Sequence, residues 1–168
     1  MRRLGADFDE FVIGRSSALL RTAMLLTGDR HDAEDLVQTA LLRVARHWSR
    51  ALDNPEAYTR RVLVNLAYDR SRYRKRRPER LGPPPDRVAP DHYAEDRDDL
   101  LRLLRQLPDR QRATVVLRYW EDLSVAETAQ LLGCTEGTVK SATSKALAHL
   151  REALDLPLTD AIGAKDAH

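Results

Sequence analysis

A stretch rich in proline and glycine, RPERLGPPPDRVAP at residues 77–90, limits the folds open to this chain more than any other feature. It has neither helical nor strand periodicity, because proline and glycine at this density interrupt regular elements. The acidic segment DHYAEDRDD follows it directly. We therefore predict a linker over residues 78–95 that joins two folded units, 1–77 and 96–154, and a separate tail, 155–168.

Helical spacing dominates the first unit. Apolar side chains recur at intervals of three and four residues from Phe8 to Leu26, and TGDR then interrupts the pattern. The segment HDAEDLVQTALLRVARHW predicts a second helix at about 32–48, with acidic residues in its first turn, where the helix dipole favours them. Asn54 and Pro55 predict the cap and first residue of a third helix that extends to about Arg76.

The second unit is also helical. DRDDLLRLLRQL predicts a short amphipathic helix that stops at Pro108, and DRQRATVVLRYW begins another. Ser124 and Glu127 form a capping-box pattern at the start of the next helix, which Gly133 ends, and Thr135 can cap a last helix from 136 to about 154. The expected fold class is all-α, with two small helical domains joined by a Pro-rich linker.

The composition narrows the classes of partner. Charged residues make up 32% of the 168 residues but the net charge is only +2, so nucleic-acid binding would depend on local segregation of charge. The single cysteine, Cys134, excludes an intramolecular disulfide framework and suits a reducing cytoplasm. The N-terminus lacks the apolar core of a secretory signal, and no apolar run reaches the roughly 18 residues of a membrane span. We expect a cytoplasmic protein.

The segment around Gly133 matches a helix-turn-helix. Ala129 lies four residues before this glycine, where two crossing helices leave room only for a small side chain. The positions expected to be buried around the turn are Leu132, Cys134, Val139 and Ala142. The side chains expected to point outward from the last helix are Thr138, Lys140, Ser141, Ser144 and Lys145.

This outward face carries small hydroxyls and lysines, which can enter a DNA major groove and donate to phosphates and base edges. The alternative is an ordinary helical hairpin with a solvated face, since such patterns have false positives. We interpret Cys134 as a packing residue beneath the turn, with no chemistry of its own.

A basic stretch ends the first unit. RSRYRKRRPER, residues 70–80, has seven basic residues and one acidic residue, with Tyr73 inside it and Tyr68 just before. Basic side chains neutralise phosphates and aromatic rings stack on unpaired bases, so the combination suits single-stranded or melting DNA. A solvated helix end is the alternative. Asn65 either hydrogen-bonds within the bundle or reads a base, and Asp69 can pair with Arg72.

The start of the predicted second helix has a different character. Asp32, Glu34, Asp35 and Gln38 form an acidic and polar edge beside apolar residues, which could dock against a basic protein surface. Acidic residues at a helix start are also explained by the helix dipole alone.

Taken together, these segments resemble the bacterial RNA polymerase sigma factors of the extracytoplasmic-function group (group IV of the sigma-70 family). DAEDLVQTALLRVARHW looks like region 2.1 to 2.2, and AYTRRVLVNLAYDRSRYRKR like region 2.3 to 2.4. LPDRQRATVVLRYWEDLSVAETAQLLG looks like region 4.1 into 4.2, and CTEGTVKSATSKALAHLREAL like the recognition helix. The match covers about residues 6–154, and four segments in the correct order are more specific than any single one.

The resemblance implies a sigma factor that binds core RNA polymerase and directs promoter-specific initiation, without a catalytic role. By this resemblance, the residues of the core-polymerase surface are Asp35, Leu36 and Gln38. The residues near the minus-ten element are Asn65, Asp69, Arg72, Arg74 and Lys75. The residues at the minus-thirty-five element are Thr138, Lys140, Ser141, Ser144 and Lys145. The sequence departs from the common pattern in having no arginine and no aromatic residue in the exposed middle of the recognition helix.

The remaining expectations concern other classes of function. A free-standing helix-turn-helix regulator is the main alternative to a sigma factor. A nucleic-acid-processing enzyme has little support, because the five histidines are scattered, the carboxylates form no recognisable metal set and no glycine-rich phosphate loop is present. We expect no cofactor and no metal, and the resemblance leaves open an anti-sigma factor as a further partner.

Overall fold

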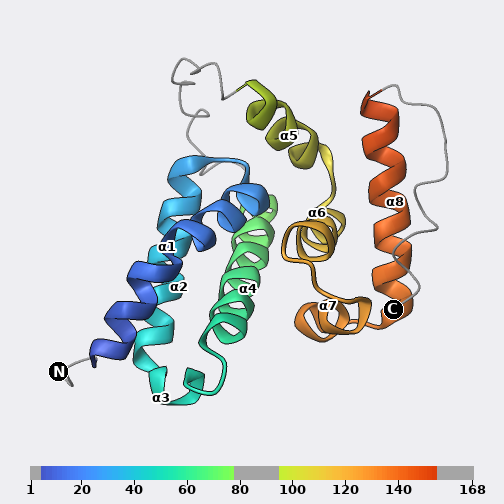
Figure 1. Cartoon of the computed structure of the whole chain (residues 1–168). Coiled ribbons are helices and arrows are strands. Elements are labelled where there is room, and N and C mark those ends of the chain that lie inside the picture. The colour runs from blue at the N-terminus through green and yellow to red at the C-terminus, as the bar shows by residue number, and fades with distance from the viewer. Residues whose placement is uncertain (1–4, 78–94, 155–168) are drawn as a thin grey trace.

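The computed structural model describes residues 5–77 and 95–154, and all regular elements in these ranges are helical, as the periodicity predicted (Figure 1). The predicted linker, apart from its last residue, and the predicted tail lie outside the described residues. The helices before the linker are α1 (Ala6–Thr27), α2 (Arg30–Arg46), α3 (Trp48–Ala51) and α4 (Pro55–Arg76). The elements after it are α5 (Glu95–Gln106), α6 (Asp109–Val115), the π-helical turn η2 (Val116–Trp120), α7 (Val125–Leu132) and α8 (Glu136–Leu154).

The helix ends of the first unit follow local signals in the sequence. Gly28 ends α1 with a left-handed backbone at φ 72°, a conformation that costs glycine little. The side chain of Asp29 then caps α2 by accepting a hydrogen bond from the backbone N–H of Asp32 at 2.8 Å. Asn54 caps α4 in the same way, with Pro55 at the first helical position, so this prediction is confirmed.

The second predicted helix ends earlier than expected. It stops at Arg46 rather than near residue 48, and α3 forms a separate short turn. The reason is tertiary packing: the ring of Trp48 lies 5.1 Å from the ring of Phe8 and 5.3 Å from that of Phe11, centroid to centroid. The turn of the chain at His47 brings the ring of Trp48 against the rings at the start of α1. This contact buries aromatic surface, which favours the break in the helix.

The core of the first unit forms where α1, α2 and α4 pack together. Its buried members are Leu19, Ala23, Ala33, Leu36, Val37, Ala40, Leu63 and Leu66. Three of these are alanines without exposed surface, which lets the helices approach closely. A smaller cluster of Phe8, Val44 and Ala51 closes the end near α3.

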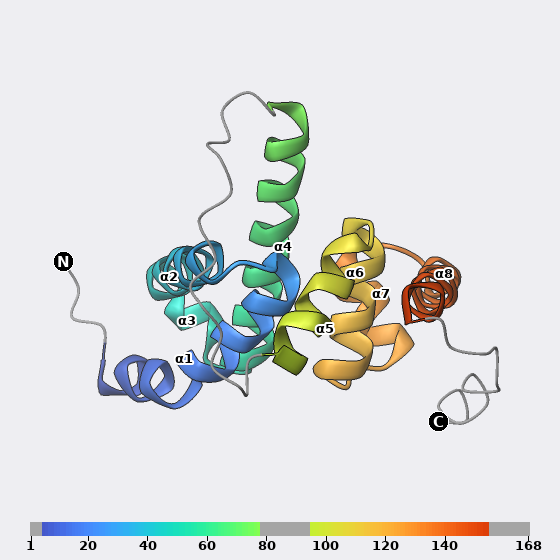
Figure 2. The same ribbon diagram turned by 90° about the horizontal axis from the view of Figure 1, so that it is seen from above.

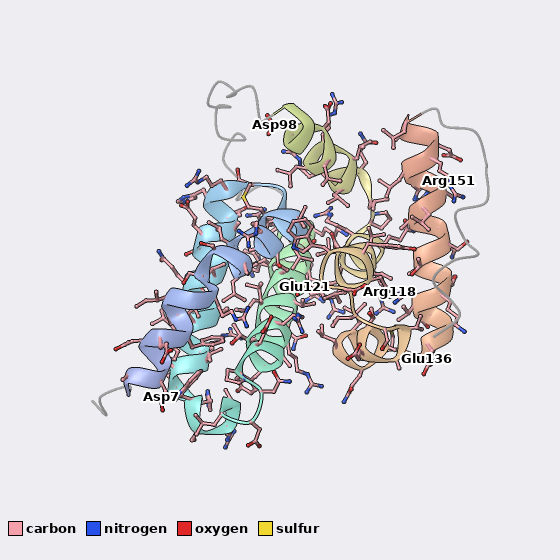
Figure 3. All side chains as sticks on the ribbon, in the orientation of Figure 1. Asp7, Asp98, Arg118, Glu121, Glu136 and Arg151 are labelled. Carbon is pink, nitrogen blue, oxygen red and sulfur yellow. The ribbon has the colours of Figure 1, made fainter. Side chains whose placement is uncertain are left out.

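The second unit has the four helical segments that the sequence predicted, with one local difference. The helix that begins at Asp109 ends in the π-helical turn η2, where the N–H of Glu121 donates to the carbonyl of Val116 at 3.0 Å. The wider turn is followed by Asp122 at φ 54°, which redirects the chain into α7. The side chain of Glu121 is thereby turned toward the first unit (Figure 3).

The two units are packed against each other in this structure (Figure 2). One apolar cluster contains Leu25, Leu26 and Val64 from the first unit together with residues of the second. The second-unit members are Leu101, Leu104, Leu107, Ala113, Val116, Leu117 and Ala146. Residues on both sides of the predicted linker thus share one core.

Candidate nucleic-acid interface

The turn between α7 and α8 has the geometry of a helix-turn-helix. The hydroxyl of Ser124 accepts from the N–H of Glu127 at 3.1 Å, and the Glu127 carboxylate accepts from the N–H of Ser124 at 2.7 Å, which completes the predicted capping box. The hydrogen bond from the backbone N–H of Ser124 is the main cause that lowers the pKa of Glu127, and the interaction with the Ser124 side chain is the second. Gly133 ends α7 at φ 63°, and the hydroxyl of Thr135 caps α8 by accepting from the N–H of Thr138 at 3.1 Å.

The inner side of this motif is close to the prediction. Ala129, Val139 and Ala142 are buried, and Ala129 has the small side chain that the helix crossing needs. Leu132 and Cys134 are only half-buried, so they line the edge of the turn rather than its centre. The thiol of Cys134 is free.

The outer side of α8 presents the predicted polar face. Lys140, Ser141, Ser144 and Lys145 are all exposed. Thr138 is half-buried, and its hydroxyl lies 2.9 Å from that of Thr135, so it borders the face rather than standing at its centre. The four exposed side chains supply two ammonium groups and two small hydroxyls, which can donate to phosphates and base edges without blocking the approach of a major groove.

A second polar face lies along α4. Asn65, Asp69 and Arg72 are exposed and follow one another at helical spacings of four and three residues. Asn65 therefore projects from the bundle instead of being buried inside it. Within the described ranges no ion pair joins Asp69 to Arg72, so both groups are available on this face.

The other two residues predicted for the minus-ten element are engaged with carboxylates. Arg74 forms an ion pair with Asp32 of α2. Lys75 places its Nζ 2.6 Å from Oδ2 of Asp109, which belongs to the second unit. Burial raises the pKa of Asp109, but the hydrogen bonds from Lys75 and Ser71 outweigh it, and the net shift is downward. Neither pairing has a local signal in the sequence, because the partners are 42 and 34 positions apart along the chain.

The acidic edge of α2 divides into exposed and buried positions. Asp35 and Gln38 are exposed, and Asp35 pairs with Arg70. Leu36, predicted for the core-polymerase surface, has no exposed area and lies inside the apolar core of the first unit. Its helical register places it between α1 and α4, so it supports this surface from beneath. Leu42, one turn beyond Gln38, is 63% exposed and was not singled out from the sequence.

The two tyrosines near the basic stretch differ in their surroundings. Tyr73 is 53% exposed, and the guanidinium of Arg77 lies 5.6 Å from its ring centre. Tyr68 instead packs against the apolar cluster that both units share. This burial raises the pKa of Tyr68 to about 12, so its phenol stays neutral at ordinary pH. Of these two tyrosines, Tyr73 is the one with the more exposed ring.

Two further features of the described residues concern metal binding and membrane insertion. Across residues 5–77 and 95–154, His, Cys, Asp and Glu side chains form no group of three or more that could hold a metal ion. Over the same part of the chain, every helix is too short or too polar to cross a bilayer.

Comparison with known proteins assigns both halves of the molecule. A family model described as Sigma-70 region 2 matches residues 15–77, and one described as Sigma-70, region 4 matches residues 97–150. The RNA polymerase sigma-E factor of Streptomyces avermitilis is 42% identical over 153 residues, which cover 89% of this chain and 86% of that protein. The ECF RNA polymerase sigma factor SigM of Mycobacterium tuberculosis is 34% identical over 156 residues, which cover 88% of this chain and 76% of that protein.

A solved structure is similar over both units. The sigma factor RpoE of Bartonella quintana, in complex with the anti-sigma factor NepR, is 28% identical and has a TM-score of 0.73, covering 90% of this chain and 98% of that one.

The fold and its two polar faces define a two-unit helical protein of the sigma-70 type, with region 2 before the linker and region 4 after it. The chain belongs to the extracytoplasmic-function RNA polymerase sigma factors. It acts in promoter-specific transcription initiation with RNA polymerase rather than as a free-standing regulator. The family resemblance noted from the sequence is therefore confirmed.

Proposed function

We propose that this sigma factor reads its promoters with the two exposed polar faces of α4 and α8. Asn65, Asp69 and Arg72 on α4 contact the minus-ten element, with Arg74 and Lys75 beside them at the basic end of the helix. Their exposure on one side of α4 supports this role. Tyr73 is also exposed and can stack on a base that leaves the duplex as DNA melts.

The face of α8 contacts the minus-thirty-five element. Its central side chains are Lys140, Ser141, Ser144 and Lys145, and Thr138 lies at the edge. Each good base contact is worth about 1–3 kcal/mol, so a few contacts in each unit give only modest specificity. Core polymerase combines them by fixing the spacing of the two units, which makes the second contact effectively intramolecular.

The core-polymerase surface lies on α2. Asp35 and Gln38 supply polar contacts, and Leu42 adds an exposed apolar side chain one turn further along. Leu36 takes part only by holding α2 in place, because it is buried. The pairing of Asp35 with Arg70 keeps the carboxylate oriented at the surface.

The proposal also covers the boundaries of the two modules, the cellular compartment and the partners. Residues 1–77 and 96–154 act as the promoter-binding modules, joined by the linker at 78–95, and the protein has no catalytic step of its own. It works in the cytoplasm, where RNA polymerase is. Because the similar Bartonella quintana protein was solved with an anti-sigma factor, we include an anti-sigma factor among the partners of this chain.

The exposed face of α8 carries this proposal, and start-site mapping tests it. The wild-type chain and a Lys140→Ala/Ser141→Ala variant are overproduced, and transcription start sites are mapped genome-wide. We expect the wild type to create a set of start sites that share one upstream motif, and the variant to lose the sites with the weakest minus-thirty-five match. Glu152→Ala, an exposed change further along α8, is the control. An identical set of sites for wild type and variant would remove the assigned face.

A further inference from the structure

Lysine is rare in this protein, and its positions are unevenly distributed. The chain has 28 lysine and arginine residues, of which only four are lysines: Lys75, Lys140, Lys145 and Lys165. Two of the four lie on the exposed face of α8, and no other lysine occurs between residues 95 and 154. Lysine and arginine both supply a positive charge, but the amine of lysine is the group that can lose its proton and act as a nucleophile. The side-chain amines of region 4 are therefore confined to α8.

The two lysines of α8 border a strip of small side chains. Lys140 and Lys145 are five positions apart, which places them about 140° apart around the helix axis at about 3.6 residues per turn. The exposed positions between them are Gly137, Ser141, Ser144 and Ala148. The helix itself lies at the outer edge of the molecule, on the side away from α1–α4 (Figure 2). A small molecule can therefore approach either ammonium group over the strip without meeting a large side chain.

Neither of these lysines is held by a carboxylate. Among the described residues, no ion pair or hydrogen bond involves the side chain of Lys140 or Lys145. Lys75 on α4 differs, because its Nζ donates to Oδ2 of Asp109 at 2.6 Å. This charge-assisted hydrogen bond must break before the Lys75 amine can attack another molecule. The two lysines of α8 are therefore more available as nucleophiles than Lys75.

We propose that Lys140 and Lys145 are sites of Nε-acylation by an activated acyl group, either an acyl phosphate or an acyl thioester. The neutral Nζ attacks the carbonyl carbon of the donor and forms a C–N amide bond. The bond from that carbon to the phosphate oxygen or the thiolate sulfur breaks, and the leaving group departs with the electron pair. The amine proton passes to water, and no oxidant or reductant takes part.

Acylation releases the face of α8 from DNA, a consequence that rests on the proposed function. The two lysines lie on opposite sides of the strip, so each faces a different wall of a major groove that receives the strip. Each phosphate that an ammonium group neutralises adds about 0.9 to the salt dependence of DNA binding. An acetylated lysine has no charge and loses this contribution, while Ser141 and Ser144 stay unchanged. The modification therefore weakens minus-thirty-five binding without altering the fold of the helix-turn-helix.

Acylation of the full-length protein tests the assignment of the sites. The protein is incubated with acetyl phosphate alone or with acetyl-coenzyme A alone, and modification of each lysine is followed over time by peptide mass spectrometry. With at least one donor, we expect Lys140 and Lys145 to react about as fast as Nα-acetyl-lysine amide in the same solution. Lys75 should react at least about threefold more slowly, because its hydrogen bond to Asp109 must break first. Asp109→Asn should reduce this difference.

Run-off transcription with core polymerase tests the effect on promoter use. Wild-type protein is treated with the faster donor, freed of the donor and compared with untreated protein. The matched control is Lys140→Arg/Lys145→Arg, which keeps both charges, Lys75, Lys165 and the terminal amine but has no amine on α8. We expect acetylation to lower the wild-type transcript about tenfold, since charge-assisted hydrogen bonds to phosphate are lost. The same treatment should leave the transcript of the control variant close to its own untreated value.

The outcomes separate the modification from the proposed function. The site assignment is overturned if Lys140 and Lys145 stay unmodified with both donors while the reference amine reacts, or if Lys75 reacts as fast as they do. The regulatory role is overturned if acetylated wild-type protein gives full transcript, or if the control variant loses transcript equally. Absence of transcript from untreated wild-type protein would instead count against the proposed function, because the mass-spectrometric result does not depend on promoters.

Discussion

Replacing Leu36 with alanine separates a supporting role in the core from a contact role at the surface. Leu36 has no exposed area, and its neighbours in the core include Ala23, Ala33 and Ala40, which also have none. Alanines on closely packed helices cannot extend into the space that the lost side chain leaves. We therefore expect Leu36→Ala to lower the free energy of unfolding by about 3–5 kcal/mol, in the upper part of the range for such truncations.

The loss is large relative to the about 5–15 kcal/mol that stabilises a typical domain. Urea denaturation followed by helical circular dichroism measures it, and the midpoint should fall at an unchanged slope. Gln38→Ala, an exposed change on the same helix, is the matched control and should alter the unfolding free energy by less than about 0.5 kcal/mol. The same control should weaken binding to core polymerase. A loss below about 1 kcal/mol for Leu36→Ala, or an equal loss for Gln38→Ala, would refute the assignment of Leu36 to the core.

Three further predictions concern the helix-turn-helix and the domain boundary. Ser124→Ala removes the cap of α7 and should lower the free energy of unfolding by about 1 kcal/mol, measured by chemical denaturation. A variant with the same unfolding free energy as the wild type would argue against the capping box. Gly133→Ala meets no atom within 4 Å but keeps φ at 63°, so the backbone strain alone should cost about 1 kcal/mol, and a stabilised variant would contradict this geometry. The folded-state pKa of Asp109 is lowered from 3.8, so its contribution to stability is complete above about pH 4 and is lost as the pH falls through the folded pKa. Asp109→Asn should reduce the fall in unfolding free energy that occurs as the pH is lowered below about 4. The same fall in the variant and the wild type would argue against the pairing with Lys75.

Local features of the fold could be predicted from the sequence because their causes are local. Asn54 followed by proline, Ser124 with Glu127, and Gly133 each fix a helix end through neighbouring residues, and all three appear as expected. The end of α2 could not be predicted in the same way. It depends on Trp48 reaching rings on α1, and that contact outweighs the helical preference of the segment.

The candidate site was predictable to the extent that helical register decides exposure. The outward positions of α8 follow from the inward positions of Val139 and Ala142, which periodicity gives directly. The same reasoning applied to α2 would have placed Leu36 inside, since it continues a stripe with Ala33 and Ala40. The pairing of Arg60 with Glu121 had no such signal, because the two residues are 61 positions apart and meet only when the units pack.

Run-off transcription with purified core polymerase tests the central claim most directly. Templates carry a promoter taken from the mapped start sites, intact or with either the minus-ten or the minus-thirty-five element scrambled. We predict a defined transcript from the intact promoter only when this protein is added to core, and a strong loss of transcript from each scrambled template. No transcript above core polymerase alone, or equal transcript from all three templates, would contradict promoter recognition by the two units.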